Sequence, residues 1–76
     1  MGKTPILVED VLRTFNNSRN IYRTIYGIAK ETNTKKKLVR KIVKLMIKAE
    51  LLYNSHYINQ YNRKLYTTNK NAIRAI

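Results

Sequence analysis

The sequence predicts a small α+β domain in which three helices precede a β-hairpin. Three observations indicate this class. Apolar residues recur at helical spacing in three early segments, a tight polar turn separates the last two, and strand-like alternation begins after Leu52. The 76 residues suffice for a single domain, with an ordered core over about 5–68 and a short helix or tail at 69–76.

The first predicted helix covers residues 5–16. Pro5 suits its first turn, because the amide that proline lacks would have no partner there. Apolar side chains fall on one face, while Glu9 and Asp10 fall on the other. A polar break at 16–19 follows, and residues 20–23 predict a strand of two or three residues.

Two further helices are predicted at 25–32, with Thr24 as the N-cap, and at 34–52, beginning at Thr34. The third is strongly amphipathic. Its predicted core-facing stripe consists of Leu38, Val39, Ile42, Val43, Leu45, Met46, Ala49 and Leu52. Its opposite face carries Lys37, Arg40, Lys41, Lys44 and Lys48.

The remainder of the chain predicts strands at 53–58 and 64–68, joined by a polar turn at 59–63. Such a hairpin needs a helical layer to pack against, because an isolated hairpin is marginal in water. Four tyrosines in strand-like segments are expected to serve packing: Tyr22, Tyr53, Tyr57 and Tyr66. Tyr26 and Tyr61 are the better sources of a hydrogen bond to phosphate.

The charge balance indicates a polyanionic partner. Sixteen Lys and Arg against four Asp and Glu give a net charge of +12 and a pI near 10.3. Nucleic acid and acidic membrane surfaces are the two general partners for such a field. Lys35, Lys36 and Lys37 also crowd the positive end of a helix dipole, which is mildly unfavourable without a bound anion.

The sequence gives little support for a membrane protein, a disulfide-bonded protein, a metalloprotein or an enzyme. The chain has no cysteine for disulfides or thiolate metal sites, and no apolar run or signal segment, so we expect a soluble intracellular protein. His56 is the single histidine, the acids are scattered, and no glycine-rich phosphate loop occurs. We therefore expect no catalytic or metal site, no cofactor and no small-molecule substrate.

Several short motifs carry a family resemblance. Residues 24–30 resemble the first helix of a helix-turn-helix, and the spacing of Leu38, Arg40, Ile42 and Leu45 resembles its recognition helix. The pair at 51–52 and the segment 66–70 match positions flanking the family's two-stranded wing. Over residues 6–70 the chain thus resembles winged helix-turn-helix DNA-binding regulators. In composition it is similar to small ones encoded by viruses and plasmids of hyperthermophilic archaea.

Two departures from the family pattern stand out. The turn around Asn33 is one residue shorter than usual, and Glu50 stands where a glycine commonly ends the recognition helix. Either departure is able to shift the angle at which the third helix docks on DNA, or the register of that helix by one residue.

The resemblance implies a sequence-specific transcription regulator of double-stranded DNA, cytoplasmic and associated with the nucleoid. Its third helix would enter the major groove, and its wing would meet the adjacent minor groove or backbone. The predicted DNA-binding residues are Arg23, Thr24, Thr34, Lys35, Lys36, Lys37, Arg40, Lys41, Lys44, Arg63 and Lys64. Arg40 is the best choice for bidentate contact with guanine, although contact with phosphate alone stays equally open.

Three alternatives remain at this point. An architectural, chromatin-like protein would coat DNA without regard to sequence, which the excess of lysine over arginine favours. A membrane-surface or protein-docking role for the third helix conflicts with the need for its apolar stripe in the core. A weak homodimer through the first helix or through residues 72–76 is also open.

Overall fold

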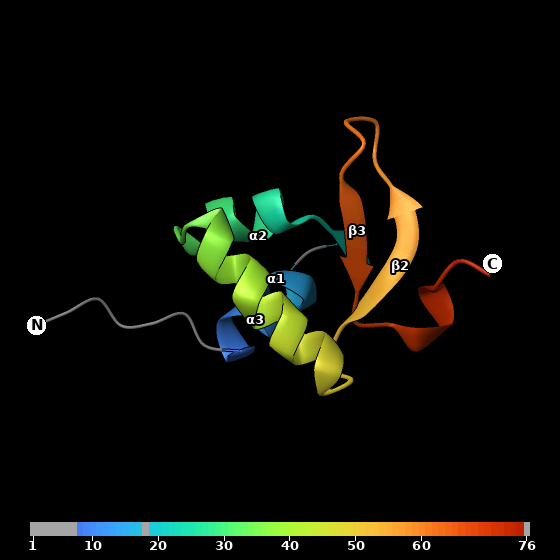
Figure 1. The fold of residues 1–76 in the computed structure, drawn as a ribbon, viewed down its shortest axis with the longest axis horizontal. Helices are drawn as coiled ribbons and strands as arrows, with labels where there is room; N and C mark the ends of the chain where they lie inside the picture. Colours follow the sequence, from blue (N-terminus) through green and yellow to red (C-terminus); the bar gives the residue numbers. More distant parts are fainter. Residues whose placement is uncertain (1–7, 18, 76) are drawn as a thin grey trace, which may run out of the picture.

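The computed structural model of the chain describes residues 8–17 and 19–75. Within these residues the protein is an α+β domain of three α-helices and one three-stranded antiparallel sheet. The elements are α1 (Val8–Asn16), β1 (Tyr22–Arg23), α2 (Ile25–Thr32), α3 (Lys36–Lys48), β2 (Tyr53–Ile58), β3 (Lys64–Thr67) and a 3-10 turn, η1 (Lys70–Ala72). The helices gather on one side, and the β2–β3 hairpin stands on the other (Figure 1).

Most predicted elements are confirmed. β1, α2 and β2 lie where the pattern places them, and β3 ends one residue before its predicted end. The tail forms the single short turn η1. α1 is helical over the described part of the first predicted helix, whose residues 5–7 lie outside the described residues.

One apolar core joins the three helices to the sheet. Val43 and Met46 of α3 are essentially inaccessible, as are Val11 of α1 and Ile28 of α2. Leu52, which follows α3, is fully buried in the same cluster. The core residues are Val11, Phe15, Ile28, Ala29, Val39, Val43, Met46, Leu52 and Tyr66.

The predicted bounds of the third helix are wrong at both ends. The N-cap of α3 is Lys35, which makes no side-chain capping bond, and the Thr34 hydroxyl instead donates to the Thr32 carbonyl at 3.1 Å. At the other end α3 stops at Lys48, because Glu50 adopts a left-handed backbone with φ of 60°. This reversal redirects the chain into the core and allows it to enter β2.

The predicted core-facing stripe is also wrong in part. Leu38 is 39% exposed, Leu45 is 64% exposed and Ala49 is also exposed, whereas Val39, Val43 and Met46 are buried. The predicted stripe covered about half of the helix circumference. The rest of the domain packs against a narrower side of α3, so the outermost apolar residues remain in solvent.

Replacing Glu50 with glycine is expected to stabilise the protein by roughly 0.5–1 kcal/mol. A left-handed conformation brings the Cβ of Glu50 close to a carbonyl oxygen, and glycine removes that contact while losing more chain entropy on folding. Urea denaturation measures the change. Glu50→Gln keeps the Cβ, so an equal gain from that variant would assign the effect to charge instead of backbone conformation.

The sheet has the order β1-β3-β2, and its hairpin is irregular. The register between β2 and β3 shifts between Asn54 and Ile58, where His56 has a φ of 65°. Ser55 Oγ sits inside this bulge, donating to the Leu65 carbonyl at 2.6 Å and accepting from the Tyr57 amide at 3.2 Å. A bulge of this kind bends a strand, and β2 curves along its length in Figure 1.

The C-terminal segment lies against the sheet. The Tyr22 hydroxyl donates to the Ala72 carbonyl at 2.9 Å, and the Arg74 amide donates to the Ser55 carbonyl at 2.7 Å. The Tyr22 ring also meets the Tyr57 ring edge-on, with centroids 5.6 Å apart. The expected packing role of these two tyrosines agrees with this arrangement.

Candidate functional site

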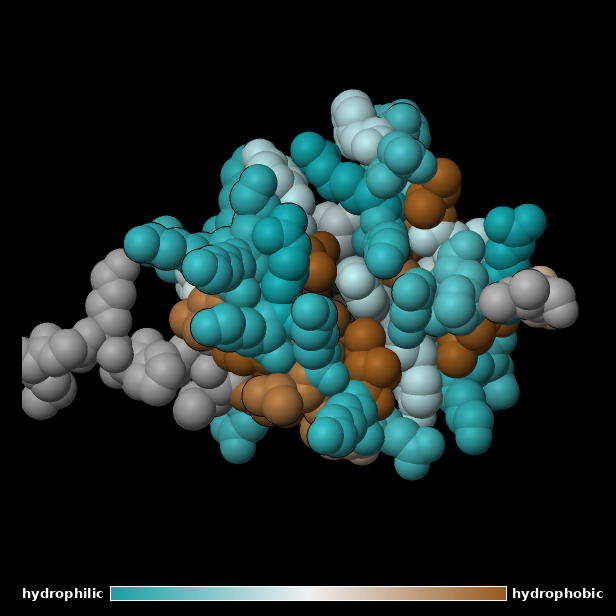
Figure 2. All heavy atoms as spheres, in the orientation of Figure 1, coloured by the Kyte–Doolittle hydropathy of each residue, from teal (hydrophilic) through white to brown (hydrophobic). Residues whose placement is uncertain are grey.

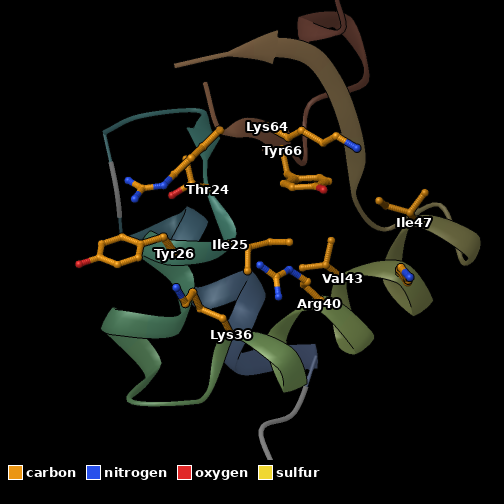
Figure 3. A pocket seen from close by; sticks show the side chains of 11 residues that line it. Thr24, Ile25, Tyr26, Lys36, Arg40, Val43, Ile47, Lys64 and Tyr66 are labelled. Carbon is orange, nitrogen blue, oxygen red and sulfur yellow. The ribbon is translucent and has the colours of Figure 1, made fainter. Parts of the chain in front are cut away.

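A cleft of about 400 Å³ opens between α2, α3 and the β2–β3 hairpin. Its floor is apolar and comes from Ile25, Val43 and Ile47, with the Tyr66 ring above them (Figure 3). Its lining residues are Thr24, Ile25, Tyr26, Lys36, Arg40, Val43, Lys44, Ile47, Arg63, Lys64 and Tyr66.

The walls of this cleft are strongly cationic, and we refer to it as the cationic cleft. Five of the sixteen cations of the chain line it, and no acidic residue is among the described residues of its lining. The five are Lys36, Arg40, Lys44, Arg63 and Lys64. Cations facing one space without carboxylates repel one another, so an anion bound there would relieve the repulsion.

Helical spacing and the hairpin together build the cationic cleft. Lys36, Arg40 and Lys44 recur every four residues, which sets them along one side of α3. Arg63 and Lys64 lie where the hairpin tip enters β3, facing that side. The spacing on α3 was readable in the sequence, whereas the approach of the hairpin depended on the tertiary fold.

Arg63 is held in place by two tyrosine rings. Its guanidinium carbon lies 4.7 Å from the centroid of the Tyr26 ring and 5.4 Å from that of Tyr61. The Asn59 side chain shapes the hairpin tip by accepting from the amides of Tyr61 and Arg63, both at 2.9 Å. Lys36 also approaches the Tyr26 ring, at 5.6 Å. These cation–π contacts join the hairpin tip to α2 and α3 across the mouth of the cleft.

Tyr66 presents a protonated phenol to the cationic cleft. Burial raises the pKa of the Tyr66 hydroxyl, and the nearby Arg40 guanidinium lowers it to a smaller extent. The net pKa lies above the ordinary value for tyrosine, so the phenol stays neutral at physiological pH. A neutral phenol can donate a hydrogen bond to an anion. The sequence prediction of a packing role for Tyr66 is confirmed by its burial, but it missed this second property.

Thr24 caps the start of α2 at the edge of the cleft. Its Oγ1 accepts a hydrogen bond from the Gly27 amide at 3.0 Å, as the sequence predicts for an N-cap. A Cβ at Gly27 would lie only 3.3 Å from that oxygen, so a glycine keeps the capped turn free of crowding. The positive end of the α2 dipole therefore adds to the potential near the cleft.

The structure separates the predicted site residues into groups. Thr24, Lys36, Arg40, Lys44, Arg63 and Lys64 line the cationic cleft. Lys35, Lys37 and Lys41 lie outside it but are exposed on or beside the first half of α3. The Thr34 hydroxyl is hydrogen-bonded to the Thr32 carbonyl within the turn between α2 and α3.

Arg23 is not brought to the cleft. Its side chain is only 16% exposed, forms an ion pair with Glu31 and donates to the Thr14 carbonyl at 3.4 Å. These contacts tie β1 to α1 and α2. Removing Arg23 would therefore disturb the fold before it reported on any ligand.

The same face of the molecule carries cations beyond the cleft. Figure 2 shows hydrophilic side chains spread along α3, with hydrophobic surface on both sides of them. Part of that surface is the cleft floor, and part comes from apolar side chains of α3 that remain exposed. The cationic cleft and the exposed face of α3 thus form one continuous surface.

Among residues 8–17 and 19–75, no group of three or more His, Cys, Asp or Glu could hold a metal ion. In the same part of the chain, none of the helices has the length and apolar character required to cross a membrane. No protein-family model, curated protein or solved structure matches the chain.

Proposed function

We propose that this chain is a winged helix-turn-helix protein that binds double-stranded DNA at particular sequences and regulates transcription. The observation that carries the proposal is the cationic cleft, together with the exposed cations of α3 that continue it. The order of elements supports the proposal, since helix, strand, helix, recognition helix and two-stranded wing is the succession of a winged helix. In these terms α3 is the recognition helix and the β2–β3 hairpin is the wing.

In the proposed complex α3 lies in the major groove with its exposed side toward the bases. A helix with its side chains is about 10–12 Å across, which matches the groove width of about 12 Å. Lys37 and Lys41 then face the base edges and flanking phosphates from the exposed side of α3. Arg40, at the border between that side and the cleft, can reach either guanine or phosphate.

One sugar–phosphate strand occupies the mouth of the cationic cleft. Lys36 and Lys44 approach it from α3, Lys64 approaches from the wing, and the Tyr66 phenol supplies a neutral donor. Arg63 lies over Tyr26, so its contact with an adjacent minor groove requires release from that ring. An exposed cation–π contact is worth about 0.5–1 kcal/mol, which a single phosphate contact can offset.

An architectural protein that coats DNA is the second proposal. α3 carries five lysines and one arginine, and lysine discriminates among bases less well than arginine does. The two proposals share the same surface and differ in whether Arg40 reads a base. Arg40 is therefore the residue that separates them.

Replacing Arg40 with lysine is expected to reduce the preference for a selected site over random-sequence DNA by roughly 10-fold or more. The positive charge remains, so binding to random DNA should change little, while the bidentate fork is lost. The measurement is competition between a site selected from a random duplex pool and bulk DNA.

Lys44→Arg is the matched control, because it keeps the charge at a cleft position without removing the Arg40 fork. If random-sequence DNA displaced the wild-type protein as efficiently as the best selected site, the architectural alternative would replace the regulatory one. If the protein bound no duplex even at low salt, both would be abandoned.

A further inference from the structure

Two leucines on α3 stand in solvent among lysines. Leu38 is 39% exposed and Leu45 is 64% exposed. They are seven residues apart and lie almost in line along the helix, and Lys41 and Lys48 form a second line about 60° around the helix from them. We call these four residues, Leu38, Lys41, Leu45 and Lys48, the outer ridge of α3. It lies on the side away from the buried residues Val39, Val43 and Met46.

The charge around the outer ridge restricts what can cover it. α3 contains no acidic residue, and Lys37, Lys41, Lys44 and Lys48 are all exposed. A second copy of the chain packed ridge to ridge would bring Lys41 and Lys48 against the same lysines, which is unfavourable. A partner must therefore be anionic and must also offer small apolar groups beside its charges.

Duplex DNA meets both requirements. The major groove is bordered by phosphates, and within it each thymine presents an apolar C5-methyl group. An anionic membrane fits less well, because a membrane-surface helix buries a broad apolar face in the lipid, whereas Val39, Val43 and Met46 of α3 are already buried in the core and leave two exposed leucines.

We propose that Leu38 and Leu45 contact thymine methyl groups in the major groove and so contribute to the sequence preference of the protein. This inference rests on the proposed function, in which α3 lies in that groove. Seven helical residues span about 10 Å, which corresponds to roughly three base-pair steps of B-DNA. The preferred site therefore carries thymines about three base pairs apart, on either strand, with Lys41 between the two contacts.

The test replaces single thymines of a selected duplex by deoxyuridine, which pairs identically but lacks the methyl group. Loss of one contacted methyl should weaken binding by about fourfold, the equivalent of one buried methyl-sized group. In Leu38→Ala or Leu45→Ala, the corresponding thymine-to-uracil replacement should have no further effect. Such non-additivity identifies a direct contact.

Leu51→Ala is the matched control, because Leu51 is 45% exposed but lies beyond the end of α3. It should leave the affinity for both duplexes unchanged. Thermal unfolding of each variant shows whether the fold is retained.

Several results would overturn the inference. One is duplex binding that depends on salt but is unaffected by uracil at every thymine, a result that would leave the proposed function standing. A second is a selection that enriches no thymine. Another is an equal loss of affinity for thymine and uracil duplexes in the leucine variants. Leucine variants that weaken binding to anionic vesicles but not to DNA would assign the ridge to a membrane. Absence of any duplex binding at low salt would remove the proposed function itself.

Discussion

A triple variant in which glutamine replaces Lys36, Arg40 and Lys44 is expected to bind duplex DNA roughly 10² to 10³-fold more weakly at about 0.1 M salt. All three residues line the cationic cleft from one side of α3. Each phosphate contact releases close to one counterion, which at this salt concentration contributes nearly a factor of ten to the association constant. Glutamine keeps much of the side-chain stem and the helix propensity, so the change acts mainly on charge.

The matched control removes the same charge elsewhere. Arg19, Lys30 and Lys70 are exposed and do not line the cleft. Their triple glutamine variant has the same net charge as the cleft variant and should lose far less affinity, because distant cations act only through a screened field. Equal losses in the two variants would mean that overall charge, and not the cleft, holds the DNA.

Replacing Leu52 with alanine is expected to destabilise the protein by about 2–5 kcal/mol. Leu52 is fully buried and lies where the chain leaves α3 and enters β2. Truncation removes its contacts and leaves a cavity next to the helical core. For a domain of this size the loss is a large part of the total stability. Urea denaturation should show a lower midpoint concentration of urea. The slope of the unfolding free energy against urea concentration should stay unchanged.

The neighbouring Leu51 provides the comparison. It is 45% exposed, so Leu51→Ala should cost well under 1 kcal/mol. The contrast between adjacent leucines depends on the left-handed turn at Glu50, which points one of them inward. Similar losses of stability in the two variants would mean that the turn at Glu50 does not direct Leu52 inward and Leu51 outward.

The elements that could be predicted from the sequence are those fixed by local chemistry. Thr24 caps α2 through a bond to an amide three residues later, and Asn33, in a left-handed conformation with φ of 53°, ends the helix. The strands could be predicted because alternation begins as soon as the helical period ends. The small α+β architecture followed from the order of these segments.

The bounds of α3 depended on information that the pattern does not contain. The apolar period continues past Lys48, but Glu50 is forced into a left-handed conformation so that Leu52 can reach the core. Glutamate gives little local signal for such a turn, whereas glycine would have given one. Leu38 and Leu45 fit the period equally well, and only the width of the packed side of α3 leaves them exposed.

The candidate site could be predicted in part. Its α3 cations follow from helical spacing, and the hairpin cations follow from the resemblance to winged helices. The placement of Arg63 against Tyr26 joins residues distant in the sequence and required the folded chain. Arg23 was predicted to contact DNA because it precedes the cap of α2. In the structure its side chain instead forms an ion pair with Glu31.

The most direct test of the proposed interface is the salt dependence of duplex affinity, compared between the wild-type protein and the variant lacking Lys36, Arg40 and Lys44. If all three side chains neutralise phosphates, the slope of log K against log salt should be smaller in magnitude by about 2.7 in the variant, and by about 1.8 if Arg40 contacts a base instead. An unchanged slope in this variant, with a reduced slope in the triple variant of Arg19, Lys30 and Lys70, would contradict the account and place the DNA on another surface.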